Sequence, residues 1–213
     1  FLLISVLVGV LAMFFGIAAS LIFDSAFQGR YGAFAFIPLV LAIGVGLGHL
    51  SHRIGIGLLV ILALVSVISV ARELSRDRTQ IGEVAASIEK NGTVGDTVVF
   101  CPDQLAPAAH RVLEEEFNLY AYPSLDSGQR VNWYDYEERN SKSDPVEIAK
   151  KILSLHIQEQ SIWLVWIDGY KTFGSQCGKL KEELNASSSN SRVFVHAGGE
   201  DYYNSANLVR FTK

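Results

Sequence analysis

The sequence predicts three membrane-spanning helices followed by a small, Rossmann-like α/β domain with a mainly parallel sheet. Residues 1–70 contain only three Asp, Glu, Lys or Arg residues, whereas residues 71–213 contain 16 of the 18 basic and 21 of the 22 acidic residues. Beyond residue 71, short β-branched and apolar runs alternate with stretches of helical periodicity, a pattern typical of strands and crossover helices. We therefore divide the chain into transmembrane helices at 1–71 and an α/β domain at 72–213.

Three apolar stretches, residues 1–23, 31–50 and 54–71, are the predicted membrane crossings. About 20 helical residues span the ~30 Å hydrocarbon core of a bilayer, and each stretch is close to that length. A polar loop at 24–30 and a tight turn at 51–53 separate them. Residue 1 is not Met and lies inside an apolar run without a basic start, so we expect a carboxy-terminal fragment of a longer membrane protein.

The α/β domain is predicted from its own alternation. Helices are expected over residues 71–90, after Pro107, after Pro145 and over 173–184. Strands are expected at 97–101, 119–122, 162–167, 192–196 and 208–211, and residues 131–136 are either a strand or an aromatic loop. The run at 162–167 is the most apolar, which predicts a central strand.

Two carboxylates come directly after predicted strands. Ligands of open α/β sheets bind beyond the carboxyl ends of the strands, and Asp103 and Asp168 occupy such positions. One interpretation is a polar or metal-assisted site at that edge. The other is structural, with Asp103 capping a helix and Asp168 forming a turn with Gly169.

Residues 133–139 are dense in aromatic and charged side chains. Trp133, Tyr134 and Tyr136 could stack on sugar rings while neighbouring charges orient the hydroxyl groups. The same side chains could instead cap a sheet edge or rest on a membrane surface. The sequence leaves both interpretations open.

Several ligand classes receive no support from the sequence. Because no basic patch or basic-aromatic stripe occurs, we expect no nucleic acid partner. No glycine-rich phosphate loop comes after the first strand, so we expect no nucleotide. His49 and His52 lack further nearby ligands, so no metal site is predicted, and we identify no cofactor.

Four stretches carry a resemblance to a known family. Arg30-Tyr31, within residues 26–38, resembles the Arg-Tyr that opens a late membrane helix in GT-C-type glycosyltransferases. Residues 101–105, 133–140 and 173–177 are similar to the extracytoplasmic tail of a bacterial group of these enzymes. That group is related to the protein mannosyltransferases and the lipid A aminoarabinose transferases.

The resemblance implies a multi-pass protein of the bacterial cell membrane that takes a sugar from a polyprenyl-phosphate carrier and passes it to a glycan or protein acceptor. It places the Arg30 loop and the carboxy-terminal domain outside the cytoplasm, whereas charge counting alone leaves the orientation open. The family's catalytic base, an acidic residue, lies in a first large external loop that this sequence does not contain, so no catalytic residue is assigned. Arg30 and Tyr31, with Asp24 as a weaker candidate, are the expected substrate-binding residues. The alternative is a non-catalytic, membrane-anchored binding or assembly domain.

Cys101 and Cys177 are the two cysteines, and both lie in the α/β domain. Sequence separation alone favours two separate buried thiols. The external location implied by the resemblance favours a disulfide, because disulfides persist in oxidising compartments. We therefore predict that Cys101 and Cys177 are bonded.

Overall fold

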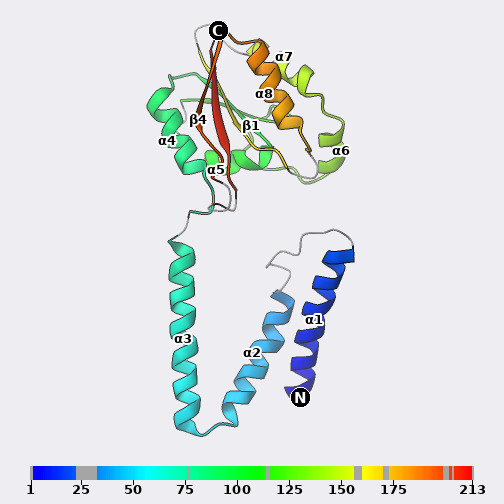
Figure 1. Cartoon of the computed structure of the whole chain (residues 1–213), viewed down its shortest axis with the longest axis vertical. Coiled ribbons are helices and arrows are strands. Elements are labelled where there is room, and N and C mark those ends of the chain that lie inside the picture. The colour runs from blue at the N-terminus through cyan, green and yellow to red at the C-terminus, as the bar shows by residue number, and fades with distance from the viewer. Residues whose placement is uncertain are drawn as a thin grey trace. The chain divides into compact units, whose positions relative to one another are not determined.

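The computed structural model describes residues 2–22, 33–75, 77–113, 116–155, 160–169, 173–198, 202 and 204–212. The chain divides into two compact units, Phe1–Arg76 and Asp77–Lys213 (Figure 1). The boundary lies five residues beyond the predicted one, because the third helix continues past residue 71.

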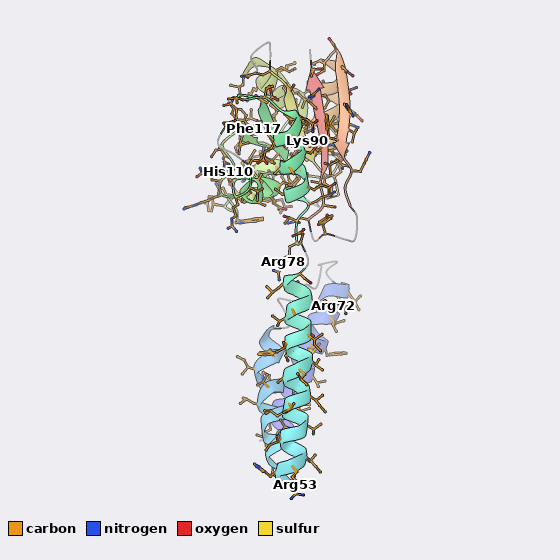
Figure 2. All side chains as sticks on the ribbon, turned by 90° about the vertical axis from the view of Figure 1, so that its left-hand side faces the viewer. Arg53, Arg72, Arg78, Lys90, His110 and Phe117 are labelled. Atoms are coloured by element: carbon orange, nitrogen blue, oxygen red, sulfur yellow. A yellow bond between two sulfur atoms is a disulfide. The ribbon has the colours of Figure 1, made fainter. Side chains whose placement is uncertain are left out.

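The first unit contains three apolar helices: α1 (Leu2–Ile22), α2 (Ala33–Gly48) and α3 (His52–Leu74). Helices α1 and α2 pack side by side. Helix α3 has no buried residue, and its apolar side chains point outward all round. Figure 2 shows Arg53 and Arg72 near opposite ends of α3, and the stretch between them carries no charged residue.

Only part of the predicted membrane domain is supported. Among the described residues, α3 is the one helix long and apolar enough to cross a bilayer. Two shorter apolar segments are Val6–Ala18, which is part of α1, and Phe36–Gly48, which is part of α2. The structure therefore supports one candidate span where the sequence predicted three.

The second unit is built on a five-stranded sheet in the order β2-β1-β3-β5-β4. The strands are β1 (Thr97–Cys101), β2 (Asn118–Ala121), β3 (Ile162–Trp166), β4 (Asn190–Val195) and β5 (Asn207–Thr212). Strand β3, the Trp-containing run, is central as predicted. Every side chain of β1 is buried, as expected for a strand covered on both faces.

The sheet is mixed: β1, β2, β3 and β4 run in one direction, as expected for a mainly parallel sheet, and β5 runs against them. Strand β1 pairs in parallel with β2 and β3, but β5 pairs antiparallel with both β3 and β4. The reason is the last connection: β5 comes after β4 without an intervening helix among the described residues, and neighbouring strands joined by a loop pair antiparallel.

Helices cover both faces of the sheet, so the predicted α/β architecture is confirmed. Helix α4 (Ile81–Asn91), the short η2 (Asp103–Leu105) and α5 (Ala106–Ala109) contribute to one hydrophobic core. Helices α7 (Pro145–Leu155) and α8 (Gln176–Ala186) contribute to the core on the opposite face. Figure 1 shows α4 and α8 on opposite sides of the strands.

One local prediction needed correction, and one that the sequence left open is now decided. The helix expected to run from Pro107 to Phe117 ends at Ala109, because the chain must reverse to enter β2 at Asn118. The segment 131–136 is not a strand. It is a loop that leads into the short helix α6 (Tyr136–Ser141), and this loop carries the exposed aromatic side chains.

Candidate functional site

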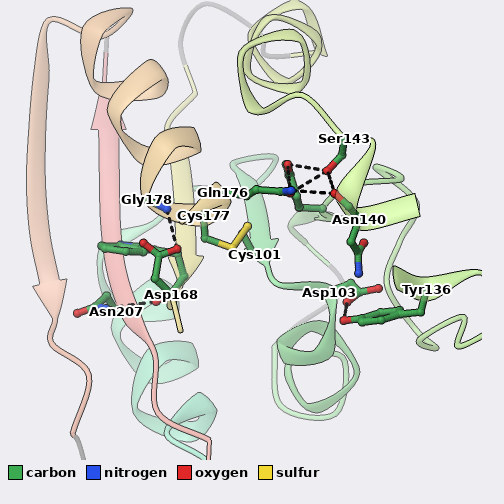
Figure 3. Close-up of a disulfide and its surroundings, with 12 residues drawn as sticks. Cys101, Asp103, Tyr136, Asn140, Ser143, Asp168, Gln176, Cys177, Gly178 and Asn207 are labelled. Atoms are coloured by element: carbon green, nitrogen blue, oxygen red, sulfur yellow. Dashed lines mark hydrogen bonds between the residues drawn. A yellow bond between two sulfur atoms is a disulfide. The ribbon is translucent and has the colours of Figure 1, made fainter. Parts of the chain in front are cut away.

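The carboxyl ends of β1 and β3 meet at one edge of the sheet, because the strands are parallel neighbours with Cys101 opposite Trp166. Asp103 and Asp168 lie just beyond these ends, so the predicted edge exists. Figure 3 shows the Cys101–Cys177 disulfide between the two aspartates, which point to different surroundings. They therefore form two separate clusters and no paired site.

Cys101 and Cys177 form the disulfide that the sequence predicted, with Cα atoms 5.5 Å apart. Both residues are fully buried. Cys101 ends β1 and Cys177 lies in the first turn of α8, so the bond joins the central sheet to the helix that covers it. The disulfide therefore holds the first turn of α8 against the carboxyl end of β1.

Asp168 has a structural role. Its Oδ1 accepts a hydrogen bond of 3.0 Å from the backbone N–H of Gly178, in the first turn of α8. The local N-cap residue, Ser175, makes no side-chain cap, so Asp168 supplies an acceptor to the electropositive end of the helix. A Cβ at position 178 would lie 2.4 Å from Asp168 Oδ2, so a larger residue there would displace the carboxylate.

Asp103 is the buried carboxylate of the edge, with 7% of its surface exposed. The Tyr136 hydroxyl donates a 2.9 Å hydrogen bond to its Oδ1, and Gln104 donates in turn to the Tyr136 oxygen at 2.9 Å. The Arg139 guanidinium lies 3.8 Å from Oδ2. Asp103 does not cap the following helix through its side chain; it anchors residues of α6 instead.

Burial favours the protonated forms of Asp103 and Tyr136 in this cluster by raising the pKa of each group. It raises the pKa of the Asp103 carboxyl above its ordinary value, against the opposing effects of the Tyr136 hydroxyl and the Arg139 charge. Burial and the nearby charge of Asp103 also raise the pKa of Tyr136 far above its ordinary value. Tyr136 therefore keeps its proton and serves as a hydrogen-bond donor to Asp103.

Asn140 adds an unused polar group beside this pair. It is fully buried, and neither atom of its side-chain amide reaches a hydrogen-bond partner. Its backbone carbonyl accepts from Ser143 Oγ at 2.7 Å and from Gln176 Nε2 at 2.8 Å. Figure 3 shows the amide directed toward Asp103, close to the Tyr136 hydroxyl.

The predicted sugar-contact residues lie beside this cluster but differ in exposure. Trp133 is 65% and Tyr134 85% exposed, whereas Tyr136 is only 9% exposed. The rings of Trp133 and Tyr136 have centroids 4.9 Å apart. Trp133 and Tyr136 line an open depression of about 680 Å³ together with Asp135, Glu137, Glu138 and Ser141.

The remaining predicted site residues cannot be placed. Asp24, Arg30 and Tyr31 lie outside the described residues. Among the residues that the structure describes, no group of three or more His, Cys, Asp or Glu residues could hold a metal ion.

Sequence reasoning missed the residues that organise the edge, chiefly Arg139, Asn140 and Gln104. The segment around residues 137–140 has the composition of a solvated helix face, and nothing in it marks Asn140 as fully buried. One signal was available: Asp135 and Arg139 are four residues apart, the spacing of a helical ion pair, which the structure contains at 3.3 Å.

Comparisons with protein-family models, with curated proteins and with solved structures find no significant match to this chain.

Proposed function

We propose that this chain is part of an integral-membrane glycosyltransferase that uses a polyprenyl-phosphate-linked sugar as donor. In this proposal the catalytic base, an acidic residue, is supplied by an external loop that this sequence does not contain. Arg30 and Tyr31, with Asp24 as a weaker candidate, contact the carrier phosphate at the mouth of the membrane cavity, because a guanidinium binds phosphate through paired hydrogen bonds. The unit Asp77–Lys213 lies outside the cytoplasm of a bacterial cell, and the apolar helices form a multi-pass domain.

The observation that carries the proposal is the disulfide in a chain that also contains a membrane-capable helix. Disulfides persist in oxidising compartments and are rare in the cytosol. A buried Cys101–Cys177 bond therefore supports an extracytoplasmic α/β unit, and α3 precedes that unit as a candidate span. This arrangement agrees with the similarity of residues 26–38, 101–105, 133–140 and 173–177 to glycosyltransferases of the GT-C type.

Replacing Arg30 by Ala tests the proposal in the full-length protein. The variant should lose most sugar transfer from a polyprenyl-phosphate donor while keeping its expression, since a hydrogen bond to a charged group contributes ~1.5–3 kcal/mol. Arg30→Lys is the matched control and should retain part of the activity. Wild-type transfer by Arg30→Ala would contradict the assignment, as would a cytoplasmic location of a reporter fused after Lys213.

A second candidate function is a non-catalytic, membrane-anchored binding or assembly domain. The bonding of the two edge carboxylates favours it: Asp168 caps α8, and Asp103 is held by Tyr136 and Arg139. Neither is therefore free to act as a base within the described structure. Absence of transfer in the wild-type full-length protein, with intact binding of a glycan or protein, would favour this candidate.

A further inference from the structure

The loop before α6, which carries the exposed rings of Trp133 and Tyr134, is held by one cation, Arg139. The Arg139 guanidinium donates to the carbonyl of Asn132 at 2.9 Å and to Asp135 Oδ1 at 3.3 Å. The backbone N–H of Tyr134 donates to Asn132 Oδ1 at 3.0 Å, which closes the turn from inside. The loop is therefore a fixed structure, although two of its aromatic side chains face solvent.

The backbone of this loop also adopts a conformation that a non-glycine residue rarely takes. Asp135 has φ 51° and ψ 20°, in the left-handed region. Such conformations persist where the surroundings over-determine them, and they cluster at ligand-binding sites. Here the hydrogen bonds of Arg139 and Asn132 supply that constraint on both sides of Trp133.

The side chain of Trp133 is supported by two stacked, buried aromatic rings. Its ring packs on Tyr136 at 4.9 Å, and Tyr136 meets the buried Phe173 edge-to-face at 5.8 Å. The Tyr136 hydroxyl is fixed in turn to Asp103. The stack holds the indole in place while 65% of Trp133 remains exposed. The indole therefore presents a flat apolar face to solvent in a fixed orientation, which a ligand with an apolar face could cover.

We propose that an uncharged saccharide binds at the depression lined by Trp133 and the carboxylates of Asp135, Glu137 and Glu138. The exposed ring of the neighbouring residue Tyr134 lies outside that lining and could extend the contact. The C–H bonds of one face of a sugar ring carry partial positive charge and pack against the electron-rich face of an indole. The hydroxyl groups at the ring edge are donors, and ionised carboxylates are acceptors only, so the lining of the depression matches a sugar in both respects.

The charges around the depression predict which saccharides are rejected. Three carboxylates surround it, while Arg139 is committed to Asn132 and Asp135 and Lys142 to Glu138. An anionic sugar would meet the carboxylate of Glu137 and would have to break the Arg139–Asp135 or the Lys142–Glu138 ion pair to gain a partner cation, which disfavours its binding. The surface therefore selects neutral saccharides over uronic acid polymers of the same length.

This inference rests on the proposed function for its biological context, as the surface that receives the acceptor glycan, but the binding can be measured without transfer. The full chain in lipid nanodiscs is titrated with neutral hexaoses of mannose, glucose and galactose, and with hexagalacturonate as the anionic probe. Binding is followed by saturation-transfer NMR and by tryptophan fluorescence. Trp133 is the tryptophan that should report, since Trp163 is fully buried and Trp166 half-buried.

At least one neutral hexaose should bind, and Trp133→Ala should weaken it about tenfold. Trp133→Phe keeps a flat ring and should bind within about threefold of wild type. Trp166→Phe, the matched control, should leave both affinity and fluorescence change intact. The near-ultraviolet circular dichroism of each variant shows that the α/β unit remains folded, and Tyr134→Ala provides a second test at a fully solvent-facing ring.

Three results would overturn the inference: no neutral hexaose binds the wild-type chain, Trp133→Ala and Tyr134→Ala both bind as wild type, or hexagalacturonate binds more tightly than the neutral probes. The transfer assay separates this outcome from a failure of the proposed function. If Arg30→Ala retains transfer while Trp133→Ala loses binding, the saccharide surface stands and the carrier assignment fails. If no saccharide binds but Arg30→Ala loses transfer, the carrier assignment stands and the saccharide surface fails.

Discussion

The ends of strands β1 and β3 carry the same sequence signal but differ in the elements that pack over them. An aspartate lies just beyond each strand, at the same edge of the sheet. Asp168 meets the free N-terminal turn of α8 and becomes a helix cap. Asp103 meets Tyr136 and Arg139, which arrive from a segment over thirty residues away. An acidic residue after a parallel strand is thus placed by the strand, while its role is decided by the element that packs over it.

The two strand ends also differ in whether a candidate binding surface lies beside them. The Asp168 end is closed, since Gly178 packs directly against the carboxylate. The Asp103 end continues outward through Tyr136 to Trp133, which is exposed. A candidate binding surface therefore lies at only one of the two strand ends among the described residues.

The largest expected effect comes from the Cys101–Cys177 bond, which joins the end of β1 to α8, the helix that Asp168 caps. The Cys101→Ser/Cys177→Ser variant should lose about 4.5 kcal/mol of unfolding free energy in the chain-entropy model, because the bond closes a loop of 76 residues. Denaturant unfolding of the full chain in detergent, followed by tryptophan fluorescence, measures this. Wild-type protein treated with reductant in denaturant is the control and should behave like the variant. An unchanged unfolding midpoint in both would show that the two ends are held by packing alone.

A smaller effect is expected at the closed end. Asp168→Ala removes the acceptor for the Gly178 N–H and should cost about 1 kcal/mol, as for the loss of a helix cap. Asp168→Asn keeps a side-chain oxygen at that position and should cost less, which separates hydrogen bonding from charge. Both are measured as shifts in the unfolding midpoint. Saccharide binding should be unchanged in both, and a loss of binding would show that the two ends are coupled.

The parts of the fold that could be predicted are those that a local pattern encodes. The run at 162–167 predicted a central strand because six consecutive apolar residues require burial on both faces. Asp144-Pro145 predicted the start of α7 through ordinary capping rules. The antiparallel β5 was not predictable, since periodicity gives strand positions but not direction. The length of α5 was missed because the reversal before β2 depends on tertiary packing.

The candidate site also contains some residues that the sequence could predict and others that it could not. Cys101 and Cys177 could be paired once their strand and helix were recognised and an external location was inferred, because burial and neighbouring positions bring them together. Trp133 and Tyr134 were recognisable by composition. Asn140 and the hydrogen bonds of Arg139 were not, because a polar residue in a short charged helix gives no signal that it is buried.

The smallest expected effect is a pH dependence of the unfolding free energy. It tests the end of β1, where Asp103 is buried, most directly. The folded-state pKa of Asp103 is raised above the ordinary carboxyl value of 3.8 by burial. Between the ordinary and the raised pKa, the folded protein holds a proton that the unfolded chain has released, so unfolding free energy falls as pH rises through this window. Asp103→Asn cannot titrate but keeps an oxygen that accepts from Tyr136. The unfolding free energy of the variant minus that of wild type should therefore increase from about pH 4 upward and then level off.

Tyr136→Phe sharpens this test because it preserves the ring contacts with Trp133 and Phe173 and removes only the donor to Asp103. The Tyr136 hydrogen bond stabilises the ionised carboxylate and lowers its pKa, against the larger effect of burial. Without it, the pKa of Asp103 should rise further, and the window in which stability falls should extend to higher pH. A difference between Asp103→Asn and wild type that is independent of pH, in both backgrounds, would show that solvent reaches Asp103 in the folded protein. The anchoring of the Trp133 stack through a buried carboxylate would then be wrong.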